Sequence, residues 1–208
     1  MLLAEELLLL LTRKTTSRSP FYSGTHAALA AAVLVELAEI DQLTIADGWV
    51  TIHPGDRHPL VPDFNGASVE RAVLHTGMGL YPVLLDRLTD QGVLTPGTRL
   101  GRPVWRLADR PRRDALVAEL AVVLAGDEPQ TTRTGTLIGL LHAMKVIELV
   151  LFADGSRAAR IADEWPVNAF TATVDDCERS GADLPGVLLL DNRRKWALRP
   201  SEPPSPSR

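Results

Sequence analysis

Residues 26–40, HAALAAAVLVELAEI, decide the fold because they form an almost continuous apolar run of residues that favour a helix. The five alanines in its first half cost no side-chain entropy in a helix and let neighbouring helices approach closely. Ser23 or Thr25 can cap its start, and Glu36 and Glu39 are its only acidic residues. A helix that is apolar on nearly every side must be covered, so we predict a buried central helix here.

The composition is that of an ordinary globular chain. It has 208 residues, of which 45% are hydrophobic and 23% are charged, which is enough for one sizeable core. The net charge of -4 argues against general nucleic-acid binding. The single cysteine, Cys177, excludes an internal disulfide, suits a reducing compartment and is expected to be a packed small side chain. We expect one domain over residues 1–199 and a disordered proline- and serine-rich tail over 200–208.

Further helices are predicted to cover the central one. Residues 1–11 are too short to span a bilayer, and Glu5 and Glu6 stand where an export signal needs positive charge. We therefore expect a first helix that docks one apolar face on the core. The other predicted helices lie at 68–76, 81–91, 114–125, 134–152, 157–165 and 168–180. The helix at 134–152 is the second one that is nearly all apolar.

Two β-hairpins are predicted among these helices. Residues 43–52, LTIADGWVTI, alternate apolar and polar residues around Asp47-Gly48, which is the strongest short-range hairpin signal. The second hairpin pairs Val93-Leu94 with residues 104–107 across a predicted turn at 96–103, PGTRLGRP. The predicted fold class is therefore mainly α, a single-domain helical bundle with buried central helices, peripheral amphipathic helices and protruding β-hairpins.

The second hairpin carries the most distinctive charge pattern of the chain. Six arginines fall within fifteen residues, opposed only by Asp109, and they are Arg99, Arg102, Arg106, Arg110, Arg112 and Arg113. Leu100, Val104 and Trp105 lie between them. Such a cluster on a projecting hairpin suits an anionic surface, such as a layer of lipid headgroups or a phosphate-bearing ligand. Alternatively, the arginines are solvated charges on an exposed edge strand, where they discourage aggregation.

The sequence contains no phosphate-binding glycine loop, nucleophile elbow or internal repeat. His53, Asp56 and His58 lie in a turn-rich segment and match no standard metal-site spacing, so we expect no metal and no other cofactor. Glu36 and His142 lie on the two most apolar helices and are the candidate internal acid and base. The alternative is that Glu36 caps or pairs with a neighbouring helix and that His142 has a structural hydrogen bond.

Four segments resemble, in order and spacing, the Golgi phosphoprotein 3 family in its bacterial branch. The resemblance covers about residues 2–180, and the segments are LLAEELLLLL at 2–11, AAVLVELAEIDQL at 31–43, LTDQGVL at 88–94 and LIGLLHAMKVI at 137–147. It implies a single, mostly helical domain in which amphipathic helices ring a hydrophobic bundle and a protruding β-hairpin is used in self-association. Eukaryotic members bind phosphatidylinositol 4-phosphate at Golgi membranes and link glycosyltransferases to vesicle coats.

The headgroup pocket implied by this resemblance is largely changed in this chain. Its aromatic residue before the central helix aligns with Phe21, and its three basic positions align with Ala30, Met78 and Tyr81. Three of the four headgroup contacts are thus lost, and the replacements suit a neutral or apolar ligand better. The expected ligand contacts are Arg18, Phe21, Tyr22, Met78 and Tyr81.

Three functions follow from these observations. The first is a peripheral membrane adaptor, cytoplasmic or on the inner face of the membrane, that binds anionic lipid headgroups and forms a homo-oligomer through residues 96–106. The hairpin contacts are then Arg99, Leu100, Arg102, Trp105 and Arg106. The second is a winged-helix regulator, but residues 81–91 hold only Arg87 as a basic residue, so no nucleic-acid partner is expected. The third is an enzyme or carrier that acts on an apolar small molecule in a cavity between the helices.

Overall fold

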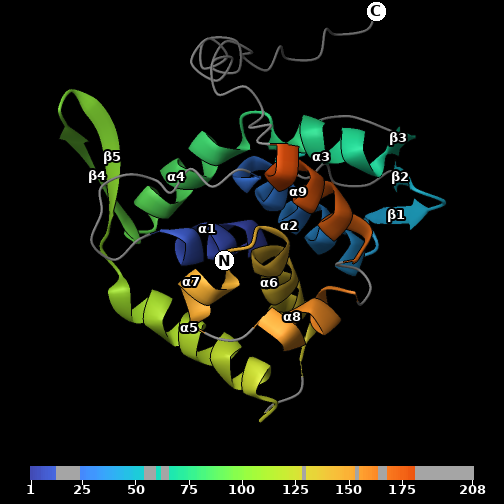
Figure 1. The fold of residues 1–208 in the computed structure, drawn as a ribbon. Helices are drawn as coiled ribbons and strands as arrows, with labels where there is room; N and C mark the ends of the chain where they lie inside the picture. The colour runs from blue at the N-terminus through green and yellow to red at the C-terminus, as the bar shows by residue number, and fades with distance from the viewer. Residues whose placement is uncertain are drawn as a thin grey trace, which may run out of the picture.

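Two apolar helices occupy the centre of the fold, and the other helices pack around them (Figure 1). The first, α1 (Leu3–Leu11), is buried along its whole length, and the second, α2 (Thr25–Glu39), is buried from Thr25 to Val35 and at Leu37. The computed structural model describes residues 1–12, 24–53, 60–61, 66–127, 130–152, 155–163 and 168–180. The predicted central helix is confirmed as α2, whereas α1 is buried on all sides instead of docking one face.

The surrounding helices follow the predicted order. They are α3 (Val69–Gly77), α4 (Leu80–Asp90), α5 (Arg110–Ala125), α6 (Thr132–Ala143), α7 (Ile147–Leu151), α8 (Gly155–Ala162) and α9 (Asn168–Ser180). α1 packs against α2, α4, α5 and α6, and α2 packs additionally against α3 and α9. α5 begins earlier than predicted because the Asp109 side chain accepts a hydrogen bond from the Arg112 amide at 3.1 Å and so caps the helix. None of the described helices is both long and apolar enough to cross a membrane.

The prediction of one continuous helix over 134–152 is wrong. The chain breaks between α6 and α7, where Lys145 adopts a left-handed conformation with φ of 56°. The amides of Lys145 and Val146 donate to the carbonyls of His142 and Leu141, which closes the end of α6. Lys145 Nζ also lies 3.1 Å from Asp175 Oδ1 of α9. The break redirects α7 so that Ile147, Val150 and Leu151 enter the core.

Both predicted hairpins are present. β1 (Leu43–Ala46) and β2 (Trp49–Ile52) pair around Asp47-Gly48, whose φ values of 52° and 77° are those of a tight hairpin turn. A short third strand, β3 (Ala67–Ser68), pairs with β2 and was not predicted.

The second hairpin is longer than predicted. β4 (Leu94–Arg99) and β5 (Arg102–Leu107) pair through the segment expected to be a turn, and only Leu100 and Gly101 lie between the strands. Prolines are tolerated in this pairing because each strand of the two-stranded sheet has an unpaired edge.

Candidate functional site

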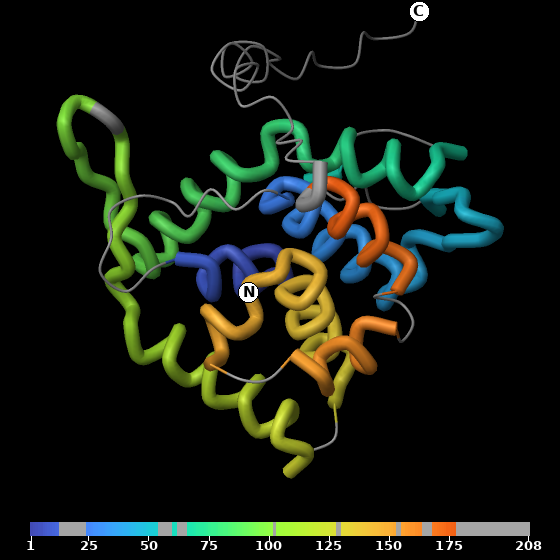
Figure 2. Tube along the Cα trace, viewed as in Figure 1, coloured from blue at the N-terminus to red at the C-terminus, as the bar shows by residue number. Residues whose placement is uncertain are grey.

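The β4–β5 hairpin projects from the helical body between the end of α4 and the start of α5 (Figures 1 and 2). Gly92, with φ of 71°, closes α4 in the left-handed conformation expected for this position. The amides of Ala108 and Asp109 both donate to the Val93 carbonyl, at 2.9 and 3.3 Å. The two strands are therefore joined where they leave the body, and the far end extends into solvent.

The tip of the hairpin presents an apolar side chain between two arginines. Leu100 is 92% exposed and has φ of 51°, and Arg99 and Arg102 are directly opposite each other in the strand register. A left-handed conformation costs a residue with a Cβ roughly 1–2 kcal/mol, and glycine or asparagine adopts it more readily. The left-handed backbone at Leu100 is thus a local cost to the stability of the fold.

The residues nearer the body divide between solvent and core. Arg106 is exposed, as are Arg110 and Arg112 at the start of α5. Trp105 lies in the predicted strand, opposite Pro96, and is half-buried against the core, so only part of its side chain is available to an external surface. Arg99, Leu100 and Arg106 are therefore the exposed residues of the predicted contact set, and Arg102 shares the tip register with Arg99.

One arginine of the predicted cluster has a structural role instead. Arg113 is 8% exposed, and its guanidinium donates to the Leu10 carbonyl at 3.0 Å. This contact satisfies a carbonyl at the end of α1 and places a positive charge at the negative end of the helix dipole. The prediction that all six arginines could contact an anionic surface is therefore wrong for Arg113, because its guanidinium is buried and is not available to an external anion.

Two acidic residues of α1 bind arginines from the surrounding helices. Glu5 has a fully buried side chain, and its Oε1 accepts from Arg87 Nε at 2.6 Å and from Gln91 Nε2 at 3.1 Å. Burial alone raises the pKa of Glu5, but the hydrogen bonds from Arg87, Leu2 and Gln91 outweigh it, so the pKa lies below its usual value. Glu5 thereby ties α1 to α4, the helix that leads into the hairpin.

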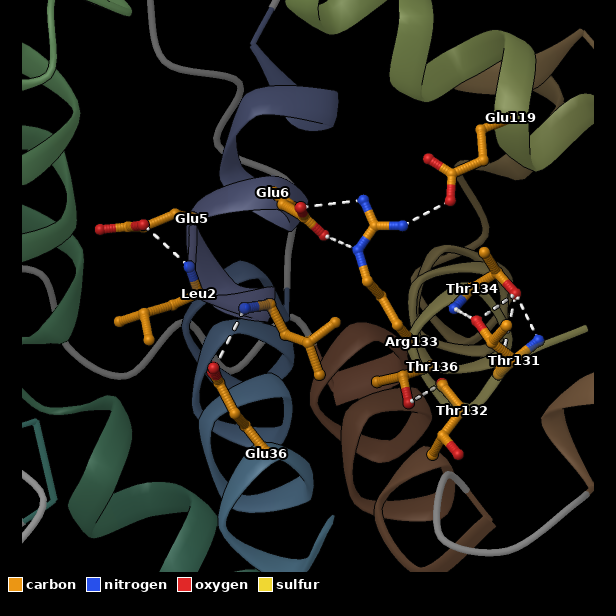
Figure 3. Close-up of polar contacts among 11 residues, drawn as sticks. Leu2, Glu5, Glu6, Glu36, Glu119, Thr131, Thr132, Arg133, Thr134 and Thr136 are labelled. Carbon is orange, nitrogen blue, oxygen red and sulfur yellow. Dashed lines mark hydrogen bonds and ion pairs between the residues drawn. The ribbon is translucent and has the colours of Figure 1, made fainter. Parts of the chain in front are cut away.

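Glu6 forms the corresponding contact on the other side of α1 (Figure 3). Its carboxylate accepts from Arg133 Nε at 2.8 Å and from Nη2 at 2.9 Å, and Arg133 also binds Glu119 of α5. The hydrogen bond to Glu6 raises the pKa of Arg133. The sequence interpretation missed these contacts, although two glutamates within a run of leucines were a signal that buried partners exist.

The candidate internal acid and base, Glu36 and His142, lie beside different elements. Glu36 Oε2 accepts from the Leu3 amide at 3.2 Å at the start of α1 (Figure 3), which confirms the capping alternative. Burial raises the pKa of Glu36, and the hydrogen bond from Leu3 partly offsets that effect. His142 is half-buried on α6, beside Gly155. The contact with Leu3 gives Glu36 a structural role at the start of α1.

The predicted ligand pocket is only partly described. Met78, which is 54% exposed, precedes α4, and Tyr81 lies in its first turn. The Tyr81 ring meets the His26 ring edge-on at 5.5 Å, and burial raises the pKa of the Tyr81 phenol. Ala30 is fully buried within α2. Arg18, Phe21 and Tyr22 lie outside the described residues.

Met78 and Tyr81 are separated from the hairpin by the length of α4. This helix has eleven residues, which corresponds to about 16 Å. Among the described residues, no group of three or more His, Cys, Asp or Glu side chains could hold a metal ion. His53 Nε2 instead lies 2.8 Å from Thr44 Oγ1, and Asp56 and His58 fall outside the described residues.

A comparison with protein families covers nearly all of these elements. The family model for Golgi phosphoprotein 3 (GPP34) matches residues 3–177, from the start of α1 into α9. No curated protein matches the chain significantly. The matched region includes the buried α1 and α2, the acidic contacts of α1 and the whole β4–β5 hairpin. The chain belongs to the Golgi phosphoprotein 3 (GPP34) family.

Proposed function

We propose that this protein is a peripheral membrane adaptor that binds anionic lipid headgroups through the β4–β5 hairpin, and that the same hairpin mediates self-association. The observation that carries the proposal is the exposed Leu100 between the opposed Arg99 and Arg102. A tip that is apolar and flanked by cations matches the two layers of a bilayer interface, with acyl chains beneath phosphates.

The expected energies are sufficient for reversible binding. Removing a leucine side chain from water contributes about 1.5–3 kcal/mol, and each arginine near an anionic surface contributes about 1 kcal/mol. Arg99 and Arg106 are exposed on the projecting hairpin, and Arg110 and Arg112 are exposed where it joins α5. Together, the leucine and arginine contributions support a reversible association with the membrane. Salt is expected to weaken this association because dissolved ions screen the charges.

The changed pocket residues determine which lipids we expect. Ala30, Met78 and Tyr81 stand where the family pocket has basic residues, and Ala30 is fully buried. A specific inositol phosphate would lack charged partners there. We therefore propose recognition of anionic headgroups in general, with the charge supplied by the hairpin.

Sedimentation with vesicles tests this function. Wild-type protein is expected to bind vesicles that contain phosphatidylglycerol and not to bind vesicles of pure phosphatidylcholine. It is expected to dissociate from the phosphatidylglycerol vesicles as the salt concentration is raised. Arg99→Gln with Arg106→Gln is expected to weaken binding by about 30-fold, because two charges near the surface are lost. Arg71→Gln with Arg160→Gln removes the same charge from exposed positions on α3 and α8, and serves as the control. Absent binding, salt-insensitive binding or equal losses in both variants would overturn the proposal.

A further inference from the structure

The three-stranded sheet β1–β2–β3 carries a tryptophan on its outer face, at the side of the molecule away from the β4–β5 hairpin (Figure 1). Trp49 is 56% exposed, and its partners in the strand register are Ala46 on β1 and Ser68 on β3. Val50 and Ala67, which form the next pair, are buried, so the Trp49 pairs point away from the core. The indole therefore lies in the open between two short side chains. We call this surface the tryptophan face, and it comprises Thr44, Ala46, Trp49, Thr51 and Ser68.

The tryptophan face has the chemistry of a surface that binds a peptide. Because Ala46 and Ser68 are short, a flat apolar group can lie against the Trp49 ring without displacing a long side chain. Thr44 and Thr51 are paired in the register, and both are exposed. Tryptophan is enriched at interfaces because it combines a large apolar ring with an N–H donor. Exposed aromatic rings of this kind are what proline-rich segments in the polyproline II conformation bind.

The sequence of the same chain ends with a segment of this class. Residues 199–208, RPSEPPSPSR, contain four prolines, and we call them the proline tail. Pro200, Pro203 and Pro206 recur at every third position, and a polyproline II helix has three residues per turn. The sequence therefore predicts that these three rings share one edge of such a helix, about 9 Å apart, whereas Pro204 lies on another edge. We call Pro200, Pro203 and Pro206 the proline stripe.

The proline tail is tethered within reach of the tryptophan face. The described part of the chain ends with α9, which packs against α3, and α3 in turn packs against β2 and β3. Nineteen residues lie between Ser180 and Pro200, and a flexible segment of that length spans about 22–26 Å. The nine residues of α3 extend about 13 Å. A tether of this kind gives an effective concentration on the order of millimolar, so a contact of modest affinity is populated.

Charge favours the same pairing. Asp47 is exposed in the turn that joins Ala46 to Trp49, so a carboxylate lies at the end of the tryptophan face. Arg199 and Arg208 flank the proline stripe. Arginine binds carboxylates through charge-assisted hydrogen bonds and also stacks on aromatic rings.

We propose that the tryptophan face binds a polyproline II segment and that residues 200–206 of the same chain occupy it. Prolines of the stripe stack on the Trp49 ring, and a flanking arginine pairs with Asp47. Polyproline II is largely formed before binding, so docking costs little conformational entropy. The bound tail covers the face, so a proline-rich segment of another protein has to displace it. This proposal does not depend on the proposed lipid binding.

Paramagnetic relaxation in the full-length chain tests the contact. A nitroxide is attached to Ser205→Cys, which lies off the proline stripe, in a Cys177→Ser background. The indole N–H signals of the tryptophans are recorded in nitrogen-15 labelled protein with the nitroxide oxidised and then reduced. The Trp49 signal is assigned by its loss in Trp49→Phe, and Trp105 on the β4–β5 hairpin is the internal reference.

The proposal predicts that the oxidised nitroxide lowers the Trp49 signal to about half or less and changes the Trp105 signal little. Pro203→Ala, on the stripe, is expected to restore at least half of the lost intensity. Pro204→Ala, one residue further and off the stripe, is the matched control and is expected to leave the Trp49 signal attenuated. An unattenuated Trp49 signal would overturn the proposal, as would equal signals in the two variants, because the stripe would then not be recognised.

A mixed sample distinguishes the tail of the same chain from that of a second copy. Nitrogen-15 labelled protein without nitroxide is mixed with unlabelled protein that carries it. The Trp49 signal is expected to keep its full intensity, since the tethered tail of each chain occupies its own face. Attenuation as strong as that within a single chain would overturn the intrachain assignment.

Discussion

Glu5 Oε1 lies 2.6 Å from Arg87 Nε, so a carboxylate with no exposed surface joins α1 to the helix that leads into the β4–β5 hairpin. On the other side of the hairpin, Arg113 of α5 donates to the Leu10 carbonyl at 3.0 Å. The same buried helix therefore holds both elements from which the hairpin projects. This arrangement fixes the direction of the hairpin relative to the body.

Replacing Glu5 by glutamine is expected to destabilise the protein. The change removes the charged partner of Arg87 at a buried position, but Arg87 is itself 41% exposed and can be hydrated. We therefore expect a loss of about 2 kcal/mol in the free energy of unfolding, below the 3–5 kcal/mol of a fully buried pair. Urea denaturation measures it. Glu39→Gln, on the exposed end of α2, is the control and is expected to change stability by less than about 0.5 kcal/mol.

The effect of Glu5 also depends on pH. Its pKa in the folded protein lies below the usual value of 4.5, so the folded state binds this proton less tightly than the unfolded state. The stabilisation is present above pH 4.5 and is lost as the pH falls through the folded pKa. The stability difference between wild type and Glu5→Gln should shrink on acidification. A difference that stays constant from pH 7 to pH 3 would contradict the assigned ionisation.

Glu36→Gln is expected to behave in the opposite way. Burial raises the pKa of Glu36, so its ionised form costs stability as the pH rises through the folded pKa. The glutamine carbonyl can still accept from the Leu3 amide. The variant should match or exceed wild-type stability at pH 7, by less than about 1 kcal/mol, and lose that advantage near pH 4.5. Unchanged vesicle binding would show that Glu36 has no role in lipid binding, and a marked loss of binding would show that it does.

Arg113→Ala is expected to cost about 1.5–3 kcal/mol, because it removes a charged hydrogen bond and leaves the Leu10 carbonyl without its donor. Arg112→Ala, one residue earlier and exposed, should cost less than about 0.5 kcal/mol. Thermal or urea unfolding distinguishes the two. Equal effects would mean that Arg113 is not the structural member of the arginine cluster.

Leu100→Asn separates function from stability at the hairpin tip. Asparagine tolerates the left-handed conformation and loses no buried contact, since Leu100 is 92% exposed. We expect stability to be unchanged or slightly raised, while binding to anionic vesicles falls about tenfold or more because the apolar insertion is lost. Leu149→Asn, at a 54% exposed position on α7, is the matched control. A stable Leu100→Asn variant with full vesicle binding would exclude insertion of the tip.

Local sequence signals predicted most elements because their chemistry is local. The alanine-rich run at 27–32 identified α2, and Asp47-Gly48 identified the first turn, since these two residues adopt φ values that few others tolerate. The break at Lys145 was not predictable in this way, because no glycine or proline marks it. The break depends on the packing of Ile147 and Val150 into the core and on the contact between Lys145 and Asp175. Both depend on residues that are distant in sequence.

The candidate site was predicted only in part, because some of its features depend on contacts between distant parts of the chain. The arginine density identified the β4–β5 hairpin, but sequence could not separate the buried Arg113 from its exposed neighbours, because that distinction is set by the end of α1 about one hundred residues earlier. Leu100 was predicted to lie within an eight-residue turn and instead occupies a two-residue turn. The prediction failed because prolines at 96 and 103 are typical of turns, whereas here they lie within the paired strands.

A probe at the hairpin tip tests the central claim most directly. Leu100→Cys in a Cys177→Ser background is labelled with an environment-sensitive fluorophore, and Leu149→Cys in the same background is the control. The account predicts a blue shift and increased emission at position 100 with anionic vesicles, no change with neutral vesicles, and little change at position 149. An unchanged spectrum at position 100 while the protein sediments with the vesicles would show that the hairpin is not the membrane contact.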